Sequence, residues 1–285
     1  MYDSWLDLTQ QIVGESVLKS SSLSGGCVGQ VYSLSFEVSP PLVAKIVTSH
    51  FEQLEIEGRT LIYLKENSSI PVPRVLHNDE GLLLLEFIPS DYIMNSEVQR
   101  DCARHFSKLH QCSADRYGFE FDTVIGGIVQ ANSWSSSWLD FFAEQRIQHM
   151  AQIAREAGKL GFQDCVRIGK LCHKLDKWLL EPESPSLLHG DAWGGNILFH
   201  KDRLSAVIDP ACYYGHPEIE LAFTTMFNTF GRAFFQEYEQ SRPLCEGFFK
   251  ERRDLYLIYP ILVHIALFGG SYINDLDRTL SRYGC

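Results

Sequence analysis

The sequence lacks an excess of positive charge, and its basic residues form no cluster. Its 25 lysines and arginines stand against 36 aspartates and glutamates, which gives a formal net charge of −11. A protein that binds a nucleic-acid backbone or an anionic membrane needs a basic face. We therefore expect neither nucleic acid nor a membrane surface among its partners.

Long apolar runs and cysteine pairs are also missing. No stretch approaches the roughly 18 uninterrupted apolar residues of a transmembrane helix, and the N-terminal segment MYDSWLDLTQQIVGESVLKSSS has no basic region followed by an apolar run, as a secretory signal would. The eight cysteines include no C-x-x-C pair and no neighbouring histidines at zinc-ligand spacing. These absences predict reduced thiols and a cytoplasmic protein.

The sequence has enough apolar residues for a sizeable core, since 45% of its 285 residues are hydrophobic. β-Branched and aromatic runs predict a hairpin over Val28–Phe36 and Leu42–Val47, and the apolar run Gly81–Ile88 predicts a buried strand. A helical pattern over Phe51–Lys65 lies between them. Further helical patterns follow, at Ser96–Gln111, Trp134–Ala157, Phe162–Leu180, Pro217–Phe230 and Leu244–Phe268.

These patterns predict an α+β protein of two lobes. A small β-rich N-terminal lobe with one helix would cover residues 1–88 and bind a nucleotide, and a larger helical lobe for catalysis and substrate would cover residues 89–285. A short β-like unit between residues 186 and 209 interrupts the helices.

The strongest local signal lies in that unit, where the segment HGDAWGGN contains Asp191 and Asn196, and Asp209 ends an apolar strand thirteen residues later. A kinase catalytic loop has an Asp that accepts the proton of the acceptor hydroxyl and an Asn five positions on that binds metal, and a later Asp holds Mg²⁺ at the ATP phosphates. Order and spacing match here. The alternative is a polar turn that closes a hairpin.

Lys45 lies within the apolar strand LVAKIV, where a buried ammonium needs a partner or a ligand. It fits the lysine that contacts the phosphates and pairs with a carboxylate of the next helix. Glu52, Glu55 and Glu57 are all within range, and we select Glu55. Taken alone, Lys45 would more simply be an edge lysine that guards against aggregation.

The segment Ser24–Gly29 precedes the hairpin and is a weak match to a glycine-rich phosphate loop. Its position in front of Lys45 predicts that Gly25, Gly26, Cys27 and Val28 lie over the ATP phosphates. Cys27 would then stand at the tip of the loop, either as a redox handle or as a small filler. The oligomeric state stays open, with a redox-linked dimer as one alternative.

The chain resembles the fructosamine kinase (ketosamine-3-kinase) family, a branch of the aminoglycoside phosphotransferase and choline kinase-like superfamily with a protein-kinase-like fold. The resemblance runs nearly end to end, and the segments WSSSW, HGDAWGGN and DPACYYGHPE separate this family from other phosphotransferases. The chain departs from the family in its loop, which reads SGGC instead of a triple glycine, and at Glu220, where relatives often have Asp.

The resemblance implies transfer of the ATP γ-phosphate to the 3-hydroxyl of a ketosamine, followed by decay of the unstable phosphate and release of the amine. It further implies that Asp191 acts as the base, that Asn196 and Asp209 bind Mg²⁺, and that Lys45 with Glu55 holds the phosphates. Adenine would meet the backbone of a hinge formed by Glu86, Phe87 and Ile88.

Four further residues are candidates for the substrate pocket. Trp134 and Trp138 fall one turn apart where a helix is predicted to start, so they could wall the sugar site, although tryptophans at this spacing also occur in cores. His216 and Glu218 follow the metal-binding Asp and could contact polar groups of the substrate. Capping of the helix near Pro217 is the alternative role.

The sequence leaves two other functions open. The same machinery could phosphorylate an aminoglycoside, choline or another small alcohol. A pseudokinase that serves as a binding module is an alternative of another class, but such proteins normally lose the lysine, the base or a metal ligand. This chain retains all four: Lys45, Asp191, Asn196 and Asp209.

Overall fold

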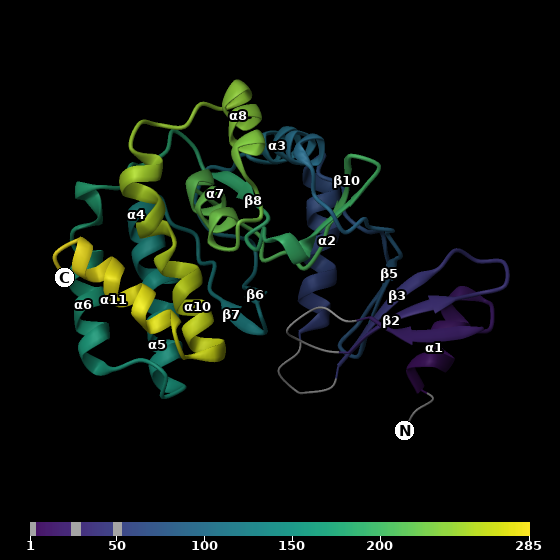
Figure 1. The fold of residues 1–285 in the computed structure, drawn as a ribbon. Coiled ribbons are helices and arrows are strands. Elements are labelled where there is room, and N and C mark those ends of the chain that lie inside the picture. The colour runs from purple at the N-terminus through teal and green to yellow at the C-terminus, as the bar shows by residue number, and fades with distance from the viewer. Residues whose placement is uncertain (1–3, 24–29, 48–52) are drawn as a thin grey trace.

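A computed structural model describes residues 4–23, 30–47 and 53–285. A β-sheet with two helices forms one lobe, and a larger body of helices lies beside it (Figure 1). The predicted α+β architecture of a β-rich lobe and a helical lobe is therefore confirmed. The first lobe has a helix that the sequence did not predict, α1 (Ser4–Val13), in addition to α2 (Leu54–Asn67).

The sheet of the smaller lobe has five antiparallel strands in the order β1-β2-β3-β5-β4. Their bounds are β1 Lys19–Ser22, β2 Gln30–Ser35, β3 Leu42–Ile46, β4 Val75–Asn78 and β5 Leu82–Glu86. The predicted hairpin is β2 and β3, which pair in the register Val31↔Lys45. The predicted buried strand is β5, which pairs with β3 so that Leu83 lies opposite Lys45.

Both faces of this sheet are covered, which explains the unbroken apolar run in β5. Leu82 and Leu84 point to the face that packs against α1, and Leu83 and Leu85 point to the face that packs against α2. Alternate residues of a strand point to opposite faces, so a strand buried on both sides has no polar positions to alternate with. Lys45 is thus placed on a strand between two covered faces.

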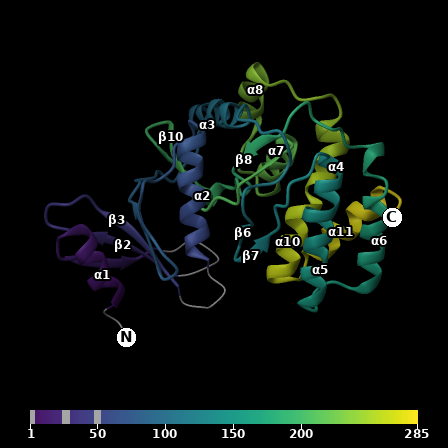
Figure 2. The same cartoon turned by 180° about the vertical axis from the view of Figure 1, so that it is seen from behind.

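The larger lobe is mainly helical (Figures 1 and 2). Its helices are α3 Ser96–Leu109, α4 Trp138–Phe141, the π-helix Phe142–Gln148, α5 His149–Glu156, α6 Phe162–Cys172, α7 Pro217–Met226, α8 Arg232–Ser241, the π-helical turn Phe248–Arg252, α9 Arg253–Tyr256, α10 Ile258–Phe268 and α11 Tyr272–Arg282. A large core of buried apolar and aromatic side chains joins them. No helix in the described ranges is both long and apolar enough to cross a membrane.

Several predicted helix boundaries are wrong. The helix predicted from Trp134 begins at Trp138, because the Ser137 hydroxyl accepts a hydrogen bond from the amide of Asp140 and so caps it. The pattern over residues 244–268 is divided by the π-helical turn and α9, and the pattern over residues 162–180 ends as a helix at Cys172. Helices α8 and α11 and strand β1 were not predicted.

Three short antiparallel strand pairs position the candidate site. They are β6 (Thr123–Ile125) with β7 (Ile128–Gln130), β8 (Ser186–Leu188) with β11 (Tyr213–Gly215), and β9 (Ile197–His200) with β10 (Arg203–Val207). Asp191 and Asn196 lie in the connection from β8 to β9, and Asp209 lies in the connection from β10 to β11. The strand pairing therefore brings the ends of both connections together.

Candidate active site

The structure joins Asp191 and Asn196 within the loop that leaves β8. The loop ends in a 3₁₀ turn, Gly194–Asn196, which turns the Asn196 side chain back toward Asp191. Its amide Nδ2 donates hydrogen bonds of 2.9 Å to both the backbone oxygen and the carboxylate Oδ2 of Asp191. The Asn196 side-chain oxygen is an acceptor that these two contacts leave unused.

Lys45 connects the two lobes at this point. Its ammonium Nζ donates to the Glu57 carboxylate at 2.7 Å and also contacts the Asp209 carboxylate. Burial opposes the positive charge, but the two carboxylates outweigh it and hold the Lys45 pKa above its ordinary value. Asp209 has a φ of 53°, an unfavourable backbone conformation that directs its carboxylate toward this cluster.

The prediction of Glu55 as the partner of Lys45 is wrong, because Glu57 takes this role. Helix α2 begins at Leu54, and residues two positions apart on a helix point to nearly opposite sides. Glu55 is exposed, and its backbone carbonyl accepts a hydrogen bond from the Asn78 amide. Glu57 was within range by sequence, and only the phase of the helix distinguishes it from Glu55.

The surroundings of Asp191 favour a protonated carboxyl in the protein alone. Burial raises its pKa to about 8, and the negative charge of Asp209 acts in the same direction, while the Asn196 amide opposes both. A carboxylate with a raised pKa is a stronger base than an exposed one. Asp191 is thus a group that can exchange a proton near neutral pH, and it acts as a base in its deprotonated form.

A buried network that the sequence did not predict holds the backbone of this loop. The Glu220 carboxylate of α7 accepts hydrogen bonds from the amides of Gly190 at 2.6 Å and His189 at 3.2 Å. The imidazole of His110 donates to Glu220 through Nε2 at 2.9 Å, and its Nδ1 lies 2.8 Å from the Tyr238 hydroxyl. The available signal was a charged residue within the otherwise apolar helix segment IELAF.

Gly190 cannot be replaced without moving the loop. Its φ of +85° lies in the left-handed region, and a Cβ at this position would stand 2.0 Å from the carbonyl oxygen of Ala211. Ala211 follows Asp209 closely in the chain, and its amide donates to the carbonyl of His189. The missing side chain therefore lets the Asp191 loop approach the segment that follows Asp209.

A pocket of about 390 Å³ opens beside Asp191. Its other walls come from the end of β6, from the 3₁₀ turn, from α7 and from α10, and they are mainly apolar and aromatic. Trp193 and Phe227 stand edge to face with ring centroids 6.1 Å apart, and Phe227 lies 5.3 Å from the ring of His264. We call this space the acceptor pocket, after the role proposed for it below. The described residues that line it are Ile125, Gly126, Asp191, Trp193, Gly194, Gly195, Phe223, Phe227, Pro260, Val263, His264, Leu267 and Phe268.

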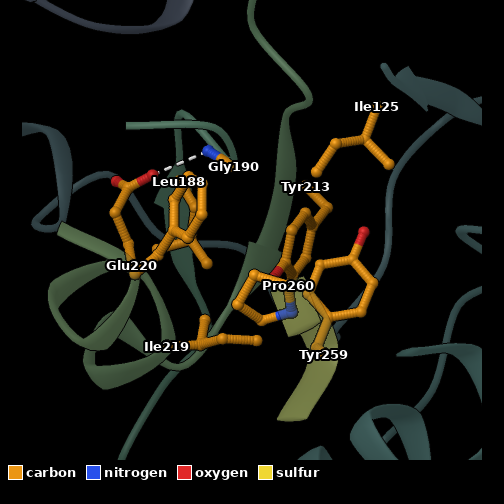
Figure 3. A pocket seen from close by; sticks show the side chains of 9 residues that line it. Ile125, Leu188, Gly190, Tyr213, Ile219, Glu220, Tyr259 and Pro260 are labelled. Carbon is orange, nitrogen blue, oxygen red and sulfur yellow. Dashed lines mark hydrogen bonds between the residues drawn. The ribbon is translucent and has the colours of Figure 1, made fainter. Parts of the chain in front are cut away.

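A much smaller cavity, of about 10 Å³, lies beside Gly190 of the Asp191 loop (Figure 3). Tyr213 and Tyr259 face it, and the Glu220 carboxylate turns away from it toward the amide of Gly190. This volume is close to the minimum for one water molecule. Three residues line both spaces and separate them from each other: Ile125, Phe223 and Pro260.

The substrate roles predicted for the two tryptophans are not supported by their positions. Trp138 is fully buried, stacks on Phe142 at a centroid distance of 5.4 Å and lies with its indole nitrogen 3.3 Å from the Tyr256 hydroxyl. Its prediction as a pocket wall is wrong, and the core alternative is confirmed. Trp134 is partly exposed beside Tyr214, on a segment before the helix, and does not line the acceptor pocket.

His216 and Glu218 are also engaged elsewhere. The Nδ1 atom of His216 accepts a hydrogen bond from the Glu218 amide at 3.1 Å and so caps α7. Both oxygens of the Glu218 carboxylate accept from the Arg252 guanidinium, at 2.7 and 2.8 Å. The capping alternative is confirmed for His216, and a substrate contact of either residue stays a prediction.

The remaining predicted residues concern the nucleotide. Gly25, Gly26, Cys27 and Val28 lie outside the described residues. The segment Glu86–Ile88 leaves β5 toward the helical lobe, and the amides of Glu86 and Phe87 donate to the carbonyls of Arg74 and Pro41. That this segment meets adenine stays a prediction.

The donors at the site fit Mg²⁺. Within the described ranges no group of three or more His, Cys, Asp or Glu side chains could hold a metal ion, so a cage built from protein ligands alone is not seen there. Mg²⁺ prefers hard oxygen donors and is commonly bound by one or two carboxylates together with substrate phosphates and water. The Asp209 carboxylate and the Asn196 side-chain oxygen supply such a partial set.

The chain is similar to known kinases along nearly its whole length. A family model described as fructosamine kinase matches residues 1–283. A probable ketoamine kinase of Vibrio parahaemolyticus is 32% identical over 98% of both chains. A chloroplastic protein-ribulosamine 3-kinase of Arabidopsis thaliana is 30% identical over 94% of this chain and 83% of its own.

Solved structures give the same picture of the fold. A putative fructosamine-3-kinase from Haemophilus somnus superposes with a TM-score of 0.87 at 29% identity, covering 100% of this chain and 98% of its own. An aminoglycoside phosphotransferase, APH(4)-Ia, superposes with a TM-score of 0.68 at 17% identity, covering 98% and 99% of the two chains. The second likeness concerns the fold alone.

Proposed function

The chain belongs to the fructosamine kinase family, and on this premise we propose that it transfers the γ-phosphoryl group of ATP to the 3-hydroxyl of a ketosamine and so leads to deglycation of the amine. The observation that carries the proposal is the position of Asp191, which lines the acceptor pocket and also contacts Asn196. Curated relatives are named ketoamine kinase and protein-ribulosamine 3-kinase, which supports a ketosamine as the acceptor.

The proposed reaction uses residues of both lobes. The acceptor hydroxyl in the pocket donates its proton to the Asp191 carboxylate while its oxygen forms a bond to the γ-phosphorus, the bond to the bridging oxygen breaks, and ADP leaves. The Lys45 ammonium, held by Glu57, would neutralise negative charge of the phosphates once ATP is bound. The 3-phosphate of the ketosamine is unstable, and its decay releases the amine.

We assign Mg²⁺ binding to Asp209 and Asn196. When bound there, Mg²⁺ would neutralise charge on the phosphate oxygens. Asn196 also keeps Asp191 oriented through its two hydrogen bonds, so it links the proposed metal site to the proposed base.

The seven described cysteines are free thiols, which supports a reducing compartment such as the cytoplasm.

The proposal is tested by incubating the protein with ATP, Mg²⁺ and a matched set of fructosamine, ribulosamine and erythrulosamine adducts of one amine. Phosphorus NMR should detect a 3-phosphate, and Asp191→Asn should abolish its formation while ATP still binds. An aminoglycoside and choline are run in parallel. Phosphorylation of only these alcohols would refute the ketosamine, and ATP binding without any transfer would favour the pseudokinase alternative.

A further inference from the structure

We infer that the outer half of the acceptor pocket selects the substituent on the ketosamine nitrogen, and that it admits alkylamine-type substituents but disfavours adducts of α-amino acids. The inference rests on the proposed function and names the class of amine at the same site. The preferred substrates carry several apolar carbons directly on the nitrogen, as an adduct of an alkylamine does. The disfavoured ones carry a carboxylate one carbon from the nitrogen.

The first support is the composition of the outer wall. Val263, Leu267 and Phe268 come from the last turns of α10, and Phe227 at the end of α7 lines the same pocket. Phe268 is 56% exposed and Phe227 is 39% exposed, although most aromatic side chains of this lobe are buried. Apolar surface left open beside a polar group is typical of a ligand wall.

The second support is the charge of the pocket. Among its described lining residues Asp191 is the one carboxylate, and none is a lysine or an arginine. The Nδ1 atom of His264 donates to the carbonyl of Pro260 at 2.7 Å, and burial lowers the pKa of the ring, so His264 is neutral with Nε2 as an acceptor. The nearby Lys159 ammonium is occupied by the carbonyls of Ala266 and Leu267, each at 2.8 Å.

The third support is the geometry of the substrate. When the 3-hydroxyl of a ketosamine meets Asp191, its nitrogen on C1 lies three bonds from C3, so the nitrogen substituent begins close to Asp191. A pocket of about 390 Å³ is within the range that holds a ligand larger than one sugar, roughly 300–1,000 Å³. The protonated nitrogen is compatible with Asp191 and with the face of Trp193. The carbons beyond it would lie along the apolar wall.

A carboxylate at the first carbon of the substituent has no partner in this arrangement. It would stand near the Asp191 carboxylate and against apolar side chains, and an unpaired charge removed from water is strongly unfavourable. An alkyl chain at the same place gains from burial, since each methylene in an apolar pocket is worth roughly a 10- to 200-fold change in specificity.

The test compares two adducts of the same ketose, one with butylamine and one with glycine. For the wild-type protein we expect kcat/KM to be at least about tenfold higher for the butylamine adduct. Leu267→Arg introduces a cation into the outer wall and should raise kcat/KM for the glycine adduct while lowering it for the butylamine adduct. Leu180→Arg is the matched control, because Leu180 is 45% exposed and lies outside the pocket, and it should leave the ratio unchanged.

The outcomes separate the two proposals. Equal kcat/KM for the two adducts with the wild-type protein would overturn the inference and leave the kinase function standing. A ratio that Leu267→Arg does not change would also overturn the assignment of this wall, and should that variant not fold, the wild-type comparison still decides. If neither adduct is phosphorylated although ATP binds, the proposed function itself fails.

Discussion

The hydroxyl oxygens of Tyr63 and Tyr214 lie 3.0 Å apart and join the two lobes. Tyr63 belongs to α2, the helix that carries Glu57, and Tyr214 belongs to β11, which follows Asp209. The ring of Tyr63 also packs edge-on against Phe119, with centroids 4.6 Å apart. The position of the lysine-binding carboxylate is thus tied to the strand that follows the proposed metal ligand.

Tyr63→Phe removes the hydroxyl contact and keeps the ring. We expect a loss of about 0.5–1.5 kcal/mol in the free energy of unfolding and a rise in KM for ATP, because α2 holds Glu57 less firmly. Tyr214→Phe should have the same effects, and the double variant should add little to either one. Fully additive losses would show that the two hydroxyl groups act independently. Tyr32→Phe is the control, since its exposed hydroxyl donates to the Gln30 side chain within the sheet.

The two glutamates of α2 give a matched pair. Glu57→Gln should lower kcat/KM for ATP by at least about tenfold, because Lys45 loses one of the two carboxylates that position its charge. Glu55→Gln should stay within about twofold of the wild type, because its side chain is exposed. Steady-state kinetics with varied ATP would decide, and a larger effect from Glu55→Gln would contradict the pairing seen here.

Asp209→Asn tests the proposed Mg²⁺ site. Loss of this negative charge should lower kcat by roughly 10²- to 10³-fold at ordinary Mg²⁺ concentrations and should shift the Mg²⁺ dependence of the rate to higher concentration. The rate is measured across a Mg²⁺ titration, with the exposed Asp176 changed to Asn as the control. Unchanged activity and Mg²⁺ dependence would remove Asp209 from the metal site.

The lowered pKa of His216 should make the free energy of unfolding depend on pH. Burial, with the nearby charges of Arg252 and Arg242 and the His110 ring, lowers its pKa from 6.5 to about 3. Between these values the unfolded chain binds a proton that the folded protein does not, so stability rises with pH across this window, by up to about 1.4 kcal/mol per pH unit. His216→Asn keeps a capping acceptor without titrating.

The measurement is chemical denaturation of both proteins from pH 7 to pH 4. The His216→Asn variant should lose less stability than the wild type as the pH falls below 6.5. Parallel curves for the two proteins would show that His216 is not a source of the pH dependence. Stability at pH 7 should change by only about 1 kcal/mol, because asparagine is as good an N-cap as any residue.

Local patterns predicted the parts of this protein that depend on neighbours in the chain. The hairpin around Lys45, the buried strand β5 and the spacing of Asp191, Asn196 and Asp209 all follow from residues close together in sequence. The choice between Glu55 and Glu57 could not be predicted in this way. It depends on where α2 begins, and a shift of one residue turns a side chain by about 100° around the helix.

Contacts between segments far apart in the sequence explain most of the other features that were predicted wrongly or not at all. The start of α4 is fixed partly by the Glu181 carboxylate, which accepts from the amides of Trp138 and Leu139 across more than 40 residues. The pairing of Glu220 with His110 spans 110 residues, so no window of sequence contains both. The accessible Trp193 lies inside the recognised HGDAWGGN motif, but its place in the acceptor pocket depends on α7 and α10.

The small cavity beneath Gly190 bears on how related enzymes can diverge. Among the described residues, Ile125, Phe223 and Pro260 line both this space and the acceptor pocket, and none of the three belongs to the hydrogen-bonding network of Lys45, Glu57 and Asp209 described above. Shortening Ile125 or Phe223 would enlarge the space on the side of the pocket that these residues line. We therefore expect that one or two substitutions at these positions, in a natural lineage or a directed-evolution library, let the enzyme phosphorylate bulkier acceptors. The residues proposed to bind the phosphates would stay the same.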